Sequence, residues 1–156
     1  MTPAVRELQR AGVDFELLDY PHDPAAPAYG EEAARALGLP PQSVFKTLLA
    51  NLDAKRLVVA LVPVSGSLDL KALARAAGGK RASMADASVA ERATGYIVGG
   101  ISPLGQKQRL ETFIDTGAQR LPCIYVSGGR RGLELALAPT DLQRLTSAKW
   151  VSLARH

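Results

Sequence analysis

The spacing of hydrophobic and polar positions predicts several short strands. Apolar and acidic residues alternate from Val13 to Leu17, which indicates a half-buried strand that runs to Tyr20. Two longer apolar runs, 44–50 and 57–64, are joined by a polar segment and predict a strand pair. We expect further strands at 96–98, 111–115, 122–126, 133–138 and 150–153.

Capping and stop signals predict the helices. Thr2 can cap a helix that has Pro3 at its first position and ends at Gly12. Thr140 and Gln143 have the spacing of a capping box for a last helix. Further helices are expected at 31–37, stopped by Gly38 and Pro40-Pro41; at 68–77, ended by Gly78-Gly79; and from Asp86, as cap, to near Gly95. The proline-rich segment 21–27 is predicted to be a loop.

This order of elements favours an α/β fold with a mixed, curled sheet. The predicted strands do not alternate regularly with helices, as a doubly wound parallel sheet would require. A chain of 156 residues is expected to form one domain, here 1–156, and can bury about 68–70% of its unfolded surface. No internal repeat, low-complexity tract or linker interrupts it.

Composition and charge limit the possible cellular compartments and binding partners. A formal net charge of +4 permits contact with a polyanion but is too mild to establish it. Cys123 is the only cysteine, which excludes an internal disulfide and fits a reducing cytosol. The segment 2–7 carries charge where a signal peptide would be apolar, and no apolar run is long enough to span a membrane. We therefore expect a cytoplasmic protein without a membrane partner.

Two glycine-rich segments are the strongest candidates for a binding site. Residues 95–107 contain four glycines and end in Lys107, and residues 127–132 contain Gly128-Gly129 followed by Arg130-Arg131. Glycine lets the backbone approach a ligand closely, so the N–H groups around Gly99-Gly100 can face an oxyanion or a carbonyl. The pattern favours one site for a small group beside a phosphate-rich partner. The competing interpretation is two tight turns between strands.

Side chains suited to catalysis are few. His22 lies in the proline-rich loop, where it can be an acid/base or a hydrogen-bonded loop residue, and His156 is the last residue. Cys123 lies in a predicted apolar strand, where a cysteine usually behaves as a small hydrophobe. The sequence contains no HExxH motif, no paired cysteines and no carboxylate cluster, so no metal site is expected. The spacing of a Walker A motif is also missing.

Lys46 is the strongest single candidate. On a strand over 44–50 it shares a face with Val44, Leu48 and Ala50. An ammonium group on an apolar face is costly unless it is paired or lies in a site. We favour a functional lysine over one at a sheet edge that extends its ammonium group to water.

Several segments together resemble the YbaK family of bacterial Cys-tRNA(Pro) deacylases, which hydrolyse cysteine wrongly attached to proline tRNA. The similarity is collinear over nearly the whole chain, and the glycine loops are its most specific parts. It implies a cytosolic trans-editing factor, related to the editing domain of prolyl-tRNA synthetases, with a curved, barrel-like mixed sheet and peripheral helices. The matching segments are 1–5, 20–24, 45–49, 84–86, 94–96, 99–107 and 124–129.

The resemblance implies a reaction that needs no protein nucleophile, metal or cofactor. The thiol of the substrate cysteine attacks its own ester carbonyl, and the protein positions it and stabilises the oxyanion. Tyr29 and Glu134 depart from the family, in which phenylalanine and aspartate are expected. The residues that match pocket positions are Tyr20, Tyr29, Lys46, Thr47, Gly99, Gly100, Ile101, Ser102 and Ser127, with Glu134 at a further one.

Roles within this implied pocket follow from chemistry. Backbone N–H groups of Gly99, Gly100 and Ile101 can hold the carbonyl oxygen, and Lys46 can bind the terminal adenosine or favour a thiolate. Tyr20 and Tyr29 can stack on adenine or wall the side-chain pocket. Candidate phosphate contacts, each equally well explained as a solvated surface charge, are Lys80, Arg81, Lys107, Arg109, Arg130 and Arg131.

Three alternatives stay open at this point. Cys-tRNA(Cys) is a second candidate substrate, and the same fold can clear another amino acid, such as alanine, from tRNA(Pro). A non-catalytic module that binds tRNA or a synthetase is the third. Because the basic charge is mild, tRNA specificity can come from a partner, for which prolyl-tRNA synthetase is the first candidate.

Overall fold

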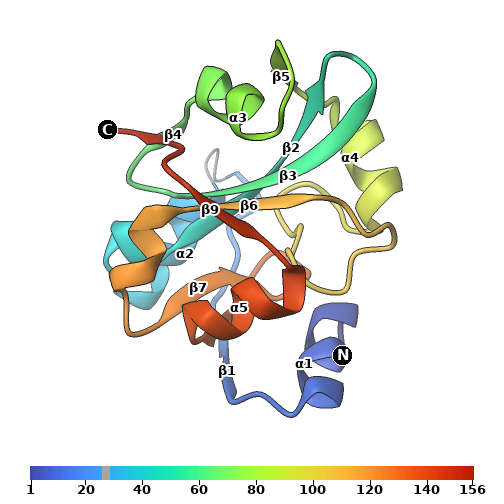
Figure 1. Ribbon diagram of the computed structural model, residues 1–156. Helices are drawn as coiled ribbons and strands as arrows, with labels where there is room; N and C mark the ends of the chain where they lie inside the picture. Colours follow the sequence, from blue (N-terminus) through green and yellow to red (C-terminus); the bar gives the residue numbers. More distant parts are fainter. Residues whose placement is uncertain (26–28) are drawn as a thin grey trace.

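A five-stranded mixed sheet forms one half of the scaffold in the computed structural model, which describes residues 1–25 and 29–156 (Figure 1). Its strand order is β5-β2-β3-β6-β9. β2 and β3 form the strand pair that the sequence predicted, and the structure shows that it is antiparallel, whereas β6 and β9 run parallel to their neighbours. The bounds are β2 Phe45–Leu52, β3 Arg56–Pro63, β5 Ala82–Met84, β6 Thr112–Asp115 and β9 Lys149–Val151.

A second, antiparallel sheet has the order β1-β8-β7, with β1 at Phe15–Asp19, β7 at Ile124–Ser127 and β8 at Leu133–Leu137. A parallel bridge between Val44 and Tyr125 links it to the larger sheet. The short strands β4 (Ser67–Leu68) and β10 (Ala154–Arg155) form a separate pair. The predicted α/β class is therefore confirmed, but the single barrel-like sheet is wrong, because the described strands divide into separate sheets that do not close.

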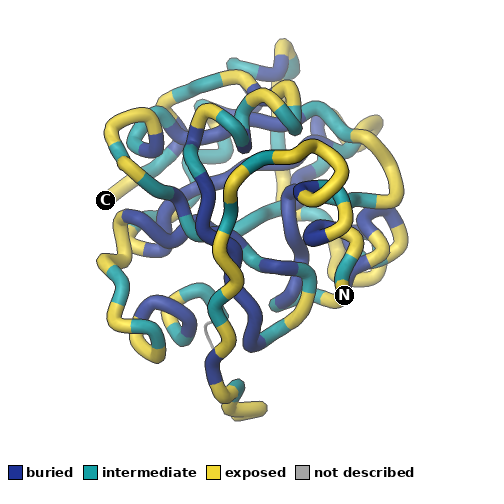
Figure 2. The backbone as a smooth tube through the Cα atoms, turned by 90° about the horizontal axis from the view of Figure 1, so that it is seen from below, coloured by how far each residue is buried: buried dark blue, intermediate teal, exposed yellow. Residues whose placement is uncertain are grey.

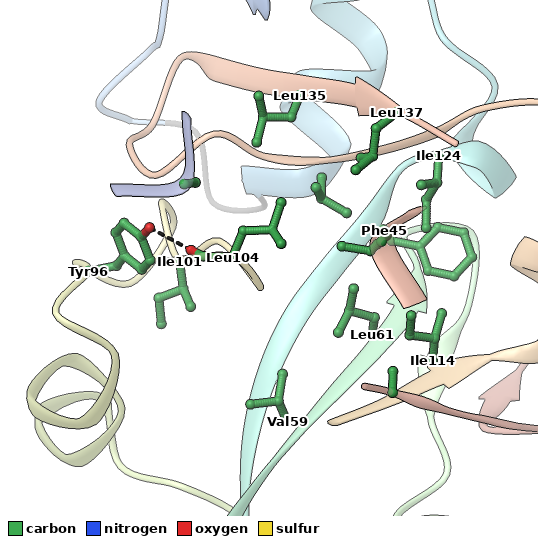
Figure 3. Close-up of a cluster of buried hydrophobic side chains, with 14 of the residues drawn as sticks. Phe45, Val59, Leu61, Tyr96, Ile101, Leu104, Ile114, Ile124, Leu135 and Leu137 are labelled. Carbon is green, nitrogen blue, oxygen red and sulfur yellow. Dashed lines mark hydrogen bonds between the residues drawn. The ribbon is translucent and has the colours of Figure 1, made fainter. Parts of the chain in front are cut away.

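The main core lies between the two larger sheets. Figure 3 shows side chains of both sheets pointing toward one another across it. Each of them is almost fully excluded from water, and burial of such a side chain is worth about 1.5–3 kcal/mol. The side chains that meet are Phe45, Leu61 and Ile114 from the larger sheet and Ile124, Leu135 and Leu137 from the smaller one.

Helices cover the outer faces of this scaffold. α3 (Leu70–Ala76) packs Leu73 against the other face of the larger sheet, where Val58 and Ala60 are buried. α1 (Pro3–Ala11) and α5 (Pro139–Thr146) lie at the opposite end of the molecule (Figure 1). The remaining helices are α2 (Tyr29–Leu37), α4 (Ala87–Thr94) and the 3-10 turns Pro41–Ser43 and Thr116–Arg120. Buried stretches run through the interior of the fold, and both termini lie at the surface (Figure 2).

Several capping predictions are confirmed. The Thr2 side chain accepts a hydrogen bond from the Val5 N–H at the start of α1, and Gly12 ends this helix with φ +69°. Gly95, with φ +80°, ends α4 in the same way. Asp86 occupies the N-cap position of α4, but its side chain makes no capping hydrogen bond. None of the described helices has the length and apolar character needed to cross a membrane.

Other local predictions are wrong, and each has a structural reason. The segment 96–98 is not a strand, because the Tyr96 hydroxyl donates to the Leu104 carbonyl, 2.6 Å away, and folds the segment into a loop. α3 begins only at Leu70, since Ser67–Leu68 pairs with β10. α5 begins at Pro139, which puts Thr140 inside the helix rather than at its cap. The expected loop 21–27 lies partly outside the described residues.

Candidate functional site

A cavity of about 290 Å³ opens beside the first half of β2. β5 pairs with β2 only from Ala50 onward, so the edge of β2 before Ala50 is not covered by β5. The cavity wall comes from the start of α2, from β2, from the loop after α4, and from β7 and β8. The predicted site residues found in it are Tyr29, Lys46, Thr47, Gly99, Ile101, Ser127 and Glu134.

The uncovered edge of β2 directs peptide groups to the cavity side. The Val64 N–H donates to the Val44 carbonyl at 2.8 Å. This hydrogen bond determines which residues of β2 point their peptide groups toward β3 and which point them away. Lys46, two residues on, therefore bonds toward β3, and the peptide groups of Thr47 point away from β3. Thr47 thus has its backbone as well as its side chain at the cavity.

Two buried polar atoms at the cavity lack hydrogen-bond partners within the described residues. They are Oγ1 of Thr47 and Oε2 of Glu134. Glu134 is only 6% exposed, and this burial raises the pKa of its carboxyl group to about 8, so the group is largely protonated at neutral pH. Because buried polar atoms are rarely left unpaired, these two mark the place of a polar ligand or of water.

Lys46 brings a positive charge to the same cavity. It is half-buried and lies on the face of β2 that packs Leu48 and Ala50 into the core under α3. Among the described residues it takes part in no ion pair. Its ammonium group is therefore available to a negatively charged part of a ligand.

Tyr29 is fixed as a wall of the cavity by two neighbours. The guanidinium carbon of Arg131 lies 3.9 Å from the centroid of its ring. Gly99 lies against this pair, since a Cβ there would lie 3.0 Å both from the Tyr29 ring and from the Arg131 side chain. Gly99 also has φ +96°, so a glycine is required here both by the backbone and by the space.

The two glycine-rich segments pack directly on each other, at Gly100. A Cβ there would lie 2.7 Å from the Cα of Arg130. The Gly100 N–H donates to the Ile97 carbonyl at 2.8 Å. The expectation that this N–H is free to hold a carbonyl oxygen is therefore wrong, although Gly99 and Ile101 do border the cavity.

Two further predicted residues lie behind the cavity wall rather than in it. Ser102 is fully buried, and its hydroxyl oxygen accepts a hydrogen bond from the Leu104 N–H. Tyr20 is buried as well; burial is the main cause that raises the pKa of its phenol, and the nearby Glu134 carboxyl adds to it. Both support the site from outside its lining.

Helix α1 holds both glycine segments, which the sequence did not indicate. The Thr2 hydroxyl donates to the Gly128 carbonyl, and the Glu7 carboxylate accepts a hydrogen bond from the Gly105 N–H at 2.6 Å. These contacts join residues about a hundred positions apart. No local pattern reveals such pairs, so they could not be found without the fold.

The remaining catalytic candidates lie outside the cavity lining. His22 Nδ1 lies 3.0 Å from Glu32 Oε1, and the Asp23 N–H donates to the other oxygen of Glu32, which fixes the loop after β1 to α2. Cys123 immediately precedes β7 rather than lying in a strand, and burial raises the pKa of its thiol. The described residues contain no cluster of His, Cys, Asp and Glu suited to a metal ion.

Comparison with known proteins adds to this geometry. Residues 23–145 match the model of the aminoacyl-tRNA editing domain family. EbsC of Enterococcus faecalis, named as a candidate Cys-tRNA(Pro)/Cys-tRNA(Cys) deacylase, is 38% identical over 123 residues, which are 79% of this chain and 75% of EbsC.

Solved structures share the fold. A candidate trans-editing enzyme for prolyl tRNA synthetase superposes with a TM-score of 0.85 at 24% identity, over 100% of this chain and 99% of its own. The hypothetical protein APE2540 superposes with a TM-score of 0.86 at 24% identity, over 98% of this chain and 99% of its own. At this identity the two likenesses show the architecture only.

Proposed function

The chain belongs to the aminoacyl-tRNA editing domain family, and on this premise we propose that it is a deacylase that removes cysteine from mischarged Cys-tRNA(Pro). EbsC, its relative, carries the name of this activity and of Cys-tRNA(Cys), which makes Cys-tRNA(Cys) a second substrate to test. The activity requires aminoacyl-tRNA as the partner, and we expect it in the cytoplasm, where aminoacyl-tRNA is made and used.

One observation supports this proposal above the others. The cavity offers a cation, Lys46, and the unpartnered polar atoms of Thr47 and Glu134, but none of the described residues that line it is a histidine or a cysteine. Such a site is equipped to hold and orient a small polar ester, and it has no histidine-activated serine or protein thiol to attack it. A nucleophile carried by the substrate itself fits these residues.

The reaction then proceeds within the substrate. The sulfur of the bound cysteine attacks the carbonyl carbon of its own ester, and the bond from that carbon to the ribose oxygen of the terminal adenosine breaks. A cyclic thiolactone forms, and the proton lost by the thiol ends on the released ribose hydroxyl. No oxidant, reductant or cofactor is consumed.

The protein contributes position and charge. Gly99 and Ile101 line the cavity and their N–H groups have no hydrogen-bond partner within the described residues, so we assign the developing oxyanion to these N–H groups. Lys46 favours the thiolate over the thiol through its charge. Thr47, Ser127 and the protonated Glu134 orient the amino and ester groups, and Tyr29 walls the side-chain pocket.

Deacylation of tRNA(Pro) charged separately with cysteine, serine and alanine tests the proposal. We expect clearance of the cysteine ester only, because the serine hydroxyl is far less acidic than a thiol with a pKa of about 8.5. Alkylation of the substrate thiol must then block clearance. Equal clearance of the three esters would indicate a water held by the protein, and no clearance at all would indicate a binding module.

Prolyl-tRNA synthetase is the partner that we propose for tRNA selection. The mild positive charge of the chain supports this role, since it provides weak attraction to any tRNA rather than discrimination. Addition of the synthetase to the deacylation assay should raise the preference for tRNA(Pro) over tRNA(Cys). An unchanged preference would mean that the synthetase does not select the tRNA for this protein.

A further inference from the structure

Two more surface hollows lie on the far side of the glycine segments from the cavity. The first, about 340 Å³, is lined by Ile97, Gly100, Gly129 and Arg131, among others, and the chain neighbours of Gly100 line the cavity. The second, about 590 Å³, lies between α1, the loop 103–110 and the end of α5. Pro3 lines both hollows, which makes them neighbours along one path.

Positive charge accumulates along this path, which we call the acceptor track. Arg130 and Arg131 line its first hollow, and Arg10 and Arg109 line its second. Among the lining residues that the structure describes, Glu7 is the only carboxylate, and one of its oxygens already accepts the Gly105 N–H. Arg130 pairs with Asp19, 3.1 Å away and outside the lining. Arg10, Arg109 and Arg131 take part in no ion pair among the described residues, so the track keeps an excess of cations.

Arg131 marks the junction between cavity and track. Its guanidinium stacks on Tyr29, a cavity residue, while its side chain lines the first hollow. Its Nε and Nη2 are buried and have no hydrogen-bond partner within the described residues. Arg131 thus places an unpaired guanidinium charge between the cavity and the track, where it attracts an anion bound at the junction.

The first hollow also offers an apolar surface. Ile97 is 75% exposed, although it lies beside buried glycine loops. Such an exposed apolar side chain can pack against the flat face of a nucleotide base, while the two arginines bind the phosphate of the same nucleotide. An acidic peptide would use the arginines but would leave Ile97 without a partner.

From this arrangement we infer that the acceptor track binds the single-stranded 3′ end of the tRNA, with the terminal adenosine at the cavity and the preceding nucleotides along Arg131, Arg130, Arg109 and Arg10. The inference rests on the proposed function for the placement of the ester. The inference also divides the candidate phosphate contacts into those on the track and those elsewhere on the surface. Lys80 and Arg81 lie beside Asp53 at the start of β5, at the end of the molecule opposite α1, and are not part of the track.

Binding of uncharged RNA tests the track without relying on catalysis. The probe is a fluorescein-labelled single-stranded oligonucleotide that ends in ACCA, and its affinity is measured by anisotropy over a salt series. For the Arg10→Ala, Arg109→Ala double variant we expect at least a tenfold weaker affinity. The slope of log affinity against log salt should become shallower by about 0.7 for each phosphate that the variant no longer neutralises.

Matched variants control for charge and for folding. Lys71→Ala with Arg75→Ala removes the same charge from α3, at the far end of the molecule, and should change the affinity less than twofold. Arg109 donates to the Ser147 hydroxyl, so Arg10→Glu, on the exposed face of α1, is a second track variant that leaves this hydrogen bond intact. Melting temperatures show whether each variant is folded.

The outcomes separate the track from the deacylase. Equal losses of affinity in the track and control variants, or none in either, would overturn the track, as would equal competition by polyglutamate of the same charge. If RNA affinity depends on the track but the protein does not cleave the ester, the track is supported and the proposed deacylase activity is wrong. Cleavage of cysteinyl-adenosine should be unaffected by the track variants, because this substrate ends at the cavity.

Discussion

The guanidinium of Arg131 lies over the ring of Tyr29, 3.9 Å from its centroid, and this contact joins the second glycine segment to the first turn of α2. A cation over an aromatic face is attracted by the ring, the more so when both are shielded from water. The pair therefore sets the position of a cavity wall, and any aromatic ring at position 29 can preserve it.

We predict that Tyr29→Phe keeps deacylation within about twofold, because the ring and its stack with Arg131 remain. Tyr29→Ala should lower kcat/KM for Cys-tRNA(Pro) at least tenfold, which corresponds to about 1.4 kcal/mol of transition-state stabilisation. Single-turnover rates measured beside the melting temperature check this prediction. If the folded alanine variant is as active as the original, the ring does not form a wall that the substrate touches.

Lys46→Ala should also lower deacylation at least tenfold while the fold survives. The physical reason is the loss of the cavity cation, since Lys46 lines the cavity and has no ion-pair partner in the described part of the chain. Lys55→Ala, on the exposed turn between β2 and β3, is the matched control and should be silent. Unchanged turnover of Cys-tRNA(Pro) by Lys46→Ala would make this lysine a solvated edge residue.

Cys123→Ala should keep most of the activity. Cys123 lies outside the cavity lining, and burial raises the pKa of its thiol, which keeps it in the less nucleophilic form. The measurement is the deacylation rate of Cys-tRNA(Pro), with the melting temperature as a check on packing. A folded but inactive variant would contradict the mechanism in which the substrate supplies the nucleophile.

These predictions rest on features that were visible in the sequence to different degrees. The placement of Lys46 and Thr47 on a strand followed from one apolar run, and the cap at Thr2 followed from local chemistry. The contact of Thr2 with Gly128 and the stack of Arg131 on Tyr29 did not, because they depend on how distant segments pack. Gly100 illustrates the same limit. The glycine-rich sequence around it indicated a bound ligand, whereas the atoms that pack against it are backbone atoms of the other glycine segment.

Gly100→Val should accordingly lose stability as well as activity. The first added carbon would lie 2.7 Å from the Cα of Arg130, so the two glycine segments must separate. Overpacking of this kind costs about 1–3 kcal/mol, and each kcal/mol lowers the melting temperature by about 2–4 °C in a chain of this size. A variant with an unchanged melting temperature and no activity would instead return Gly100 to a direct role at the ester.

The last prediction concerns the buried carboxyl group of Glu134. Burial raises its pKa from 4.5 to about 8, so the folded protein holds this proton more tightly than the unfolded chain does. The stability contributed by the protonated form is complete below about pH 4.5 and is lost as the pH rises toward 8. Glu134→Gln cannot ionise, so its free energy of unfolding relative to the original chain should increase over this range, by roughly 1.4 kcal/mol for each unit of pKa shift.

Glu32 provides a control of opposite sign. The hydrogen bond from His22 is the main cause that lowers the pKa of its carboxyl group, so its ionised form stabilises the fold above about pH 4.5, and this contribution disappears in acid. Glu32→Gln should be less stable than the original chain at neutral pH and should approach it as the pH falls. Denaturant unfolding of both variants between about pH 2.5 and 8.5 measures the two trends. Parallel curves for Glu134→Gln and the original chain would mean that this carboxyl group is ionised in the folded protein, and a charged carboxylate rather than a protonated one would then face the substrate.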